Sequence, residues 1–142
     1  MDVVEEIKRK KIGDIKKDVY MKNLTTFRVG GKADLVVYPK NIDKLIELIK
    51  ILKDNNTKFK VLGRGSNTVF SDNDYNGVII KLDELNHLDI DDTKIVVGAG
   101  YNLISLAMKV SKMGLTGIEF ATGIPGTVGG SIYMNAGAYK SD

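Results

Sequence analysis

The sequence of 142 residues contains no cysteine and no tryptophan, and it has a single histidine, His87. Without cysteine, this chain cannot form disulfides, thiolate metal sites or a cysteine nucleophile, and the composition fits a reducing cytoplasm, where we expect the protein to reside. One histidine excludes a metal site built from several imidazoles. His87 stands between Leu85 and Leu88 in a turn-like stretch, so we expect a surface or turn residue. No metal site is predicted.

Strong charge and long apolar runs are also lacking. The 21 basic and 18 acidic residues give a net charge of +3, which is too small to indicate nucleic-acid binding. The densest basic run, residues 8–11, has acidic neighbours and is typical of a solvated helix face. No apolar stretch approaches the ~20 residues that span a bilayer, and no secretory signal is visible. We therefore expect a small-molecule partner, without nucleic acid and without a membrane span.

The spacing of apolar residues predicts a mixed α+β fold. Asn41 is a plausible N-cap for the helix that follows it, and Gly114 is a plausible stop for a later one. The segment 33–62 reads as a β-α-β unit, which normally places two parallel strands in one sheet. The expected helices are 2–17, 42–55 and 102–113, and the expected strands are 33–38, 59–62, 77–82, 87–90, 94–97 and 118–121, with a loop over 18–32.

The stretch from Gly123 to Tyr139 holds five glycines within fifteen positions and carries no charge. Glycine lets a ligand approach bare backbone N–H groups, and such groups at a helix start or a concavity bind anions. This stretch is therefore interpreted as a binding loop for a phosphate-bearing cofactor.

A second glycine run, Gly63 to Thr68, follows a short apolar strand. It offers backbone donors, a hydroxyl, an amide and one guanidinium, which suit a pyrophosphate. By itself the pattern is equally typical of an ordinary tight loop. Its pairing with the later run favours phosphate binding.

Two other nucleotide-binding patterns were considered. Gly98-Ala99-Gly100 follows an apolar strand and precedes a helix, as in a Rossmann fingerprint, but the third glycine is replaced by Leu103, and Glu119 is the nearest candidate for a ribose contact. The alternative is a tight strand-to-helix turn. Neither glycine run ends in the Gly-Lys-Ser/Thr of a Walker loop, and Asp72 and Asp74 are interpreted as turn residues.

Four motifs in order carry a resemblance to a known family. They are Thr25-Thr26-Phe27-Arg28-Val29-Gly30-Gly31-Lys32-Ala33, Leu62-Gly63-Arg64-Gly65-Ser66-Asn67, Gly123-Ile124-Pro125-Gly126-Thr127-Val128-Gly129-Gly130 and Met134-Asn135-Ala136-Gly137-Ala138-Tyr139. Together they resemble the flavin-binding part of the UDP-N-acetylenolpyruvoylglucosamine reductases, from about residue 20 to the last residue.

This resemblance implies a two-lobed FAD-binding domain of the vanillyl-alcohol-oxidase (PCMH) type, with FAD between the lobes. We expect an N-terminal helical extension over 1–22, a first lobe over 23–77 and an incomplete second lobe over 78–142. The implied reaction is oxidoreduction: NADPH reduces the flavin, which passes a hydride to an enolpyruvyl double bond and yields UDP-N-acetylmuramate for peptidoglycan synthesis.

By similarity, the backbone of 63–67 would cradle the pyrophosphate, with side-chain bonds from Ser66 and Asn67, and the later loops would line the rest of the flavin. The predicted cofactor-binding residues are Leu62, Gly63, Arg64, Gly65, Ser66, Asn67, Thr68, Ala121, Thr122, Gly123, Ile124, Pro125, Gly126, Thr127, Gly129, Gly130, Asn135, Ala136, Gly137 and Ala138. Arg28 has two open interpretations, a local salt bridge or an approach to the flavin. Tyr133 and Tyr139 are expected to be packing or lid residues.

The family's active-site arginine, serine and glutamate have no counterpart in this sequence, which also lacks a substrate domain for the UDP-sugar. We therefore assign no catalytic residue, expect a fragment truncated within the second lobe, and predict no reductase activity from this chain alone. A non-catalytic nucleotide-binding or regulatory module that reuses the glycine loops is the alternative function. The sequence leaves the oligomeric state open.

Overall fold

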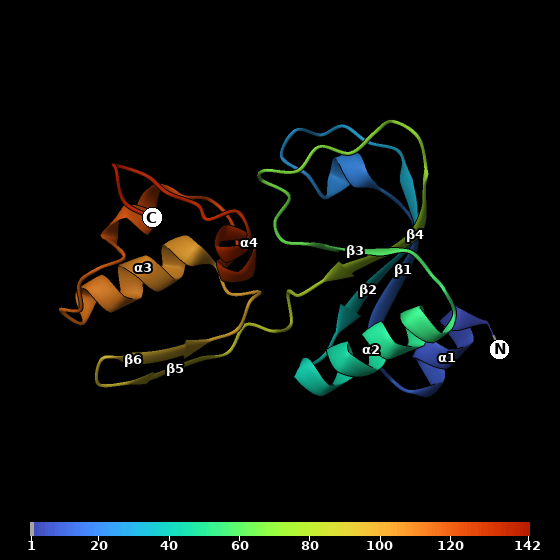
Figure 1. The fold of residues 1–142 in the computed structure, drawn as a ribbon, viewed down its shortest axis with the longest axis horizontal. Coiled ribbons are helices and arrows are strands. Elements are labelled where there is room, and N and C mark those ends of the chain that lie inside the picture. Colours follow the sequence, from blue (N-terminus) through green and yellow to red (C-terminus); the bar gives the residue numbers. More distant parts are fainter. Residues whose placement is uncertain (1) are drawn as a thin grey trace. The chain divides into compact units, whose positions relative to one another are not determined.

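The computed structural model describes residues 2–142 and divides into two compact units, one ending at Leu85 and the other running from Asn86 to Asp142 (Figure 1). Unit 1 contains α1 (Val3–Arg9), β1 (Gly13–Tyr20), the 3-10 helix η1 (Met21–Asn23), β2 (Lys32–Pro39), α2 (Ile42–Asp54), β3 (Phe59–Leu62) and β4 (Tyr75–Lys81). Unit 2 contains β5 (Leu88–Asp91), β6 (Lys94–Val97), α3 (Leu103–Lys112), the 3-10 helix η2 (Glu119–Gly123) and α4 (Val128–Tyr133).

Unit 1 is built on a four-stranded sheet in the order β1-β2-β4-β3, in which β1 is antiparallel to β2 and the other pairs are parallel. The predicted β-α-β unit is present, but β4 lies between its two strands. Since β3 and β4 run in the same direction, with Leu62 opposite Lys81, both strands end at the same edge of the sheet. The chain after β3, which holds the first glycine run, starts from this edge.

From Leu35 to Val37 the side chains of β2 alternate between the two faces of the sheet, whereas an irregularity in the pairing between Ala33 and Leu35 interrupts the alternation before them. Leu35 and Val37 of β2 join α1 and α2 in one core cluster, whereas Ala33 and Val36 join Met21 and Leu62 in a second cluster on the other face. The sheet is therefore buried on both faces.

Helix α2 begins where the sequence predicts. The side-chain amide oxygen Oδ1 of Asn41 accepts a hydrogen bond from the Lys44 N–H at 2.9 Å, and Asn55 is the C-cap. Ile51 is 1% exposed in the core, whereas Ile46 on the same helix is 61% exposed. The helix thus buries one face on the sheet and leaves the other in water.

We expect Ile51→Ala to lower the free energy of unfolding of unit 1 by about 2–5 kcal/mol, because it leaves a cavity in a closed core. Ile46→Ala removes the same atoms from an exposed position and is expected to cost less than about 1 kcal/mol. Urea unfolding of the two variants measures the difference, and equal costs would contradict the assigned face of α2.

The predicted helix over 2–17 is wrong beyond Arg9. Lys11 adopts a left-handed φ of 51°, which ends the helical path, and β1 then pairs with β2 along its length. A Cβ on Gly13 would lie 1.8 Å from the Tyr38 carbonyl oxygen, so the first residue of this strand must be glycine. Sheet pairing therefore overrides the weak helical pattern, and the N-terminal segment is part of unit 1 instead of a separate extension.

The boundary between the units also differs from the predicted 77/78. That boundary falls inside β4, whose pairing with β2 and β3 makes it a central strand of unit 1. The structure divides the chain after Leu85 instead.

Unit 2 has a smaller core, in which α3 packs on the β5–β6 hairpin. Leu106, Val110 and Val128 are its buried cluster, and Leu88, Ile95 and Ile118 are among the partly buried residues around them. The predicted hairpin and the helix capped by Asn102 are confirmed. The predicted strand over 118–121 is wrong, because Glu119–Gly123 forms a 3-10 helix.

Candidate functional site

The first glycine run leaves the sheet of unit 1 directly after β3. Leu62 is buried in the core, whereas the side chains of Arg64 and Asn67 are exposed. Ser66 and Thr68 are half-buried. Leu62 and Gly65 are thus the buried members of this predicted group, and Arg64 and Asn67 are its most accessible ones.

The segment that carries the first motif lies directly against this loop. The Thr26 N–H donates to the Gly65 carbonyl oxygen at 3.0 Å, and Thr25 is buried. Gly65 has a left-handed φ of 71°, and a Cβ there would lie 2.3 Å from the Leu24 carbonyl oxygen. The neighbouring backbone therefore requires a glycine at this position.

A buried lysine supports the loop from β4. The Lys81 Nζ donates to the Gly63 carbonyl oxygen and lies 3.4 Å from the Asp83 Oδ1, and the residue is 6% exposed. Burial and the negative charge of Asp83 together raise the pKa of Tyr38 above its usual range. Sequence reasoning missed Lys81, whose only signal is a charge at the end of an apolar strand.

The hydrogen bonds that the Gly63 and Gly65 carbonyl groups accept also orient the N–H groups that follow them in the loop. In a planar trans peptide the C=O group and the following N–H group point in opposite directions. Since the Gly63 and Gly65 carbonyl groups accept from Lys81 and Thr26, the N–H groups of Arg64 and Ser66 are each directed away from the contact that holds their own peptide. Backbone N–H groups turned outward in a short loop can bind anionic oxygens.

The rest of the first motif is structural. The Gly31 N–H donates to the Ser71 carbonyl oxygen at 3.0 Å, and the Lys32 N–H donates to the Asp74 carboxylate at 2.9 Å. Asp74 thus fixes the chain before β4, in agreement with its interpretation as a turn residue. Arg28 is exposed, with a φ of 53°.

The second glycine run, in unit 2, packs against the turn that follows β6. The Leu103 N–H donates to the Gly126 carbonyl oxygen at 3.1 Å, and the Gly129 N–H donates to the Ala99 carbonyl oxygen at 2.9 Å. A Cβ on Gly129 would lie 2.8 Å from that of Ala99. Close packing of two backbone segments therefore explains the glycine at 129.

The start of α4 does not offer the open anion site that the sequence predicted. Its first three N–H groups are bonded within unit 2: Val128 to the Tyr101 carbonyl oxygen at 2.9 Å, Gly129 to that of Ala99, and Gly130 to the Thr127 hydroxyl at 3.2 Å. The expectation that this run is rich in available N–H groups is therefore wrong at residues 128–130. A cofactor that contacts residues 128–130 would therefore lie against their small side chains, without hydrogen bonds from these N–H groups.

We expect Thr127→Ala to lower the unfolding free energy of unit 2 by about 1 kcal/mol, because the Gly130 N–H loses its cap. Thr127 is buried, whereas Thr116 is exposed, so Thr116→Ala is a matched control with an expected change within about 0.5 kcal/mol. Thermal unfolding of unit 2 is the measurement, and an unchanged midpoint for Thr127→Ala would contradict the capping role.

The C-terminal turn lies close to the second glycine run. A Cβ on Gly123 would lie 3.4 Å from the Tyr139 hydroxyl, and the Ala136 N–H donates to the Ser131 carbonyl oxygen at 2.9 Å. Ala138 and Ser141 exchange two backbone bonds across a tight turn. Unit 2 therefore brings the predicted segments 121–130 and 135–138 together.

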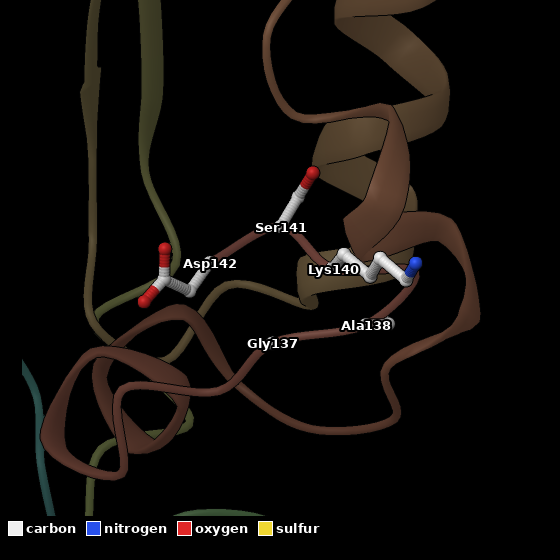
Figure 2. Close-up of a pocket in the computed structure, with 5 residues that line it drawn as sticks. All are labelled: Gly137, Ala138, Lys140, Ser141 and Asp142. Carbon is white, nitrogen blue, oxygen red and sulfur yellow. The ribbon is translucent and has the colours of Figure 1, made fainter.

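Within the first of these segments, Ala121, Gly126 and Thr127 are buried, whereas Thr122, Gly123 and Pro125 are exposed. Figure 2 shows the shallow hollow at the C-terminal turn, lined by Gly137, Ala138, Lys140, Ser141 and Asp142, with the Lys140 and Asp142 side chains pointing to different sides. The accessible part of the predicted site in unit 2 is thus the surface at 122–125 and this turn.

The Rossmann alternative is excluded by the topology of unit 2. Gly98 follows a strand of an antiparallel hairpin, and its N–H donates to the His87 carbonyl oxygen at 2.9 Å. Glu119, the candidate for a ribose contact, accepts the Gly117 N–H at 2.9 Å, and backbone hydrogen bonds lower its carboxyl pKa. Gly98-Ala99-Gly100 is therefore the tight turn that was the competing interpretation.

Over residues 2–142, three or more His, Asp or Glu side chains do not come together in a way that would hold a metal ion. Over the same range, the helices are too short or too polar to cross a membrane.

Comparison with known proteins identifies relatives over nearly the whole chain. UDP-N-acetylenolpyruvoylglucosamine reductase from Anoxybacillus flavithermus is 50% identical over 139 residues, which is 97% of this chain and 46% of that protein. The Bacillus subtilis reductase of the same name is 43% identical over 141 residues, 99% of this chain and 46% of that protein. The chain spans about half the length of the curated relatives it matches.

Solved structures agree. The crystal structure of UDP-N-acetylenolpyruvylglucosamine reductase (MurB) from Thermus caldophilus matches with a TM-score of 0.69 and 32% identity, over 90% of this chain and 44% of that one. Berberine bridge enzyme from Eschscholzia californica matches with a TM-score of 0.59 and 14% identity, over 79% of this chain and 26% of that one, and shows a shared fold. The predicted α+β fold of the PCMH type is confirmed.

A family model described as "FAD binding domain" matches residues 33–142, which include both glycine runs. The resemblance inferred from the four motifs is confirmed by this match together with the reductase relatives. The chain belongs to the FAD binding domain family.

Proposed function

We propose that this chain is the FAD-binding part of a UDP-N-acetylenolpyruvoylglucosamine reductase, an NADPH-dependent flavin oxidoreductase. The observation that carries the proposal is 50% identity over 97% of the chain to a protein of that name, a span that includes both glycine runs. The substrate of the whole protein would be the enolpyruvyl UDP-sugar and its product UDP-N-acetylmuramate. When bound, FAD supplies the hydride-transfer chemistry.

The loop of unit 1 has the donors for the diphosphate of FAD. The N–H groups of Arg64 and Ser66 are directed away from the carbonyl contacts that hold Gly63 and Gly65. The side-chain amide of Asn67, which is exposed, adds a further donor. The segment 55–71 contains no acidic residue, so no carboxylate within it repels a diphosphate. We assign residues 63–68 to this half of the cofactor.

The accessible loops of unit 2 suit a flat ring system better than a phosphate. The N–H groups at the start of α4 are already bonded, whereas the surface at residues 122–125 and 135–138 consists of uncharged residues, most of them small. Small side chains allow an aromatic ring to approach the backbone closely. We assign these residues to the flavin half of FAD, where they exclude water from the ring.

Titration of the purified, flavin-free chain with FAD tests the proposal. We expect saturable quenching of flavin fluorescence at one FAD per chain, with FAD preferred at least tenfold over riboflavin, because riboflavin lacks the diphosphate. A chain that takes up no FAD, or that binds NADPH or ATP in its place, would contradict the proposal and favour the regulatory module.

A further inference from the structure

We infer that Lys81 is a positioning residue for the diphosphate-binding loop, one that holds residues 63–67 in their binding shape. This inference rests on the proposed function of that loop. Lys81 stands on β4, opposite Leu62 of β3, and its Nζ reaches forward to the Gly63 carbonyl oxygen, the first acceptor after the strand ends. The contact therefore links a rigid central strand to the first peptide of the loop.

The burial of this ammonium group argues that the contact is strong. The residue is 6% exposed, and burying a charged amine is costly unless oxygen atoms replace the lost water. The described oxygen partners are the Gly63 carbonyl and the Asp83 carboxylate, whose side chain is 49% exposed. Because Asp83 is half in water, the carbonyl contact is the better shielded of the two, and charge-assisted bonds are the strong ones.

The direction of the Gly63 carbonyl group decides the direction of the next N–H group. With the carbonyl oxygen fixed on Lys81, the Arg64 N–H points in the opposite direction within the peptide plane, which is the direction proposed for the diphosphate. Without the ammonium group, this peptide is free to rotate.

The ion pair with Asp83 has a different task. Asp83 pairs with the Lys81 ammonium group, and it makes no described contact with residues 63–68. Loss of this carboxylate leaves the bond from Lys81 to Gly63 intact. The two partners of Lys81 can therefore be separated by mutation.

The experiment compares FAD affinity and amide hydrogen exchange among five proteins: the wild-type chain, Lys81→Met, Lys81→Arg, Asp83→Asn and Lys60→Met. Lys60 is exposed on β3, and its Nζ lies 5.8 Å and 5.7 Å from the ring centres of Phe70 and Tyr75, so Lys60→Met removes a positive charge and leaves the contact with Gly63 intact. We expect Lys81→Met to weaken FAD binding at least tenfold, with faster exchange at residues 63–67 and unchanged exchange in β2 and β4. Lys81→Arg should restore affinity to within about threefold, and the other two variants should stay within about twofold.

Three results would overturn the inference. They are wild-type affinity in Lys81→Met, a tenfold loss in Lys60→Met, and faster exchange throughout β2 and β4 in Lys81→Met, which would mean a merely structural lysine. If Lys81→Met fails to fold, Lys81→Gln takes its place, with the same expectation and the same contrary results. A wild-type chain that binds no FAD would contradict the proposed function, whereas exchange in the flavin-free chain would still decide whether Lys81 orders the loop.

Discussion

FAD affinity is expected to fall about a hundredfold when Gly65 is replaced by alanine. Gly65 has a φ of 71°, and its Cβ would lie 2.3 Å from the Leu24 carbonyl oxygen and 2.8 Å from the Thr25 Cα. Both are backbone atoms and cannot turn aside, so the two loops must separate and the bond from the Thr26 N–H to Gly65 must break. Strain at a left-handed position adds about 1 kcal/mol or more. Flavin fluorescence titration measures the loss.

Gly114 offers the matched control for this variant. It has a φ of 78°, but no heavy atom lies within 4 Å of a Cβ built there. Gly114→Ala therefore carries the same backbone strain without the steric overlap, and its FAD affinity is expected to stay within about threefold. Wild-type FAD affinity in Gly65→Ala would show that the loop does not take part in binding. An equal loss of affinity in Gly65→Ala and Gly114→Ala would show that the loss comes from general destabilisation of the fold.

In the flavin-free chain, the backbone amides of β2 and β4 are expected to exchange about a hundred to a thousand times more slowly than those of α4. Both strands pair on two sides and lie between two core clusters. Helix α4 spans six residues, and its Ile132 and Tyr133 are 76% and 89% exposed. Amides that are released by local opening exchange first. Hydrogen exchange followed by mass spectrometry or NMR measures the ratio.

With saturating FAD, amides that exchange only through global unfolding are expected to exchange roughly a hundredfold more slowly. The reason is that FAD at about 100 times its Kd stabilises the folded chain, which binds it, by about 2.7 kcal/mol. The amides of α3 are the internal reference within unit 2, because Leu106 and Val110 are buried there. Equal protection of α4 and of β2 before flavin is added would contradict the small core assigned to unit 2.

Local sequence signals predicted much of the fold, and they failed where distant pairing decides. The helices capped by Asn41 and Asn102 were predicted because a cap and an apolar period agree within one segment. The strand Gly13–Tyr20 was assigned to a helix because its pairing with β2 is not visible locally. The position of β4 inside the β-α-β unit likewise depends on residues that follow the unit in sequence.

The candidate site shows the same limit. The glycine runs were found from composition, but the reasons for Gly65 and Gly129 came from backbone segments more than twenty residues away, at Leu24 and Ala99. The family motif pointed to the residues around Thr26 without revealing that they lie against the loop. Lys81 belongs to no sequence motif, because its position beside the loop follows from the register of β4 against β3.

The central claim, that residues 63–67 bind the diphosphate of FAD, is tested most directly by an NMR titration of the labelled chain. As FAD is added, the amide signals of Arg64 and Ser66 are expected to move strongly and to saturate together with the flavin fluorescence, and riboflavin should leave them nearly unchanged. If FAD saturates the chain while the amides of 63–67 do not move, or if riboflavin moves them equally, the assignment of this loop is contradicted.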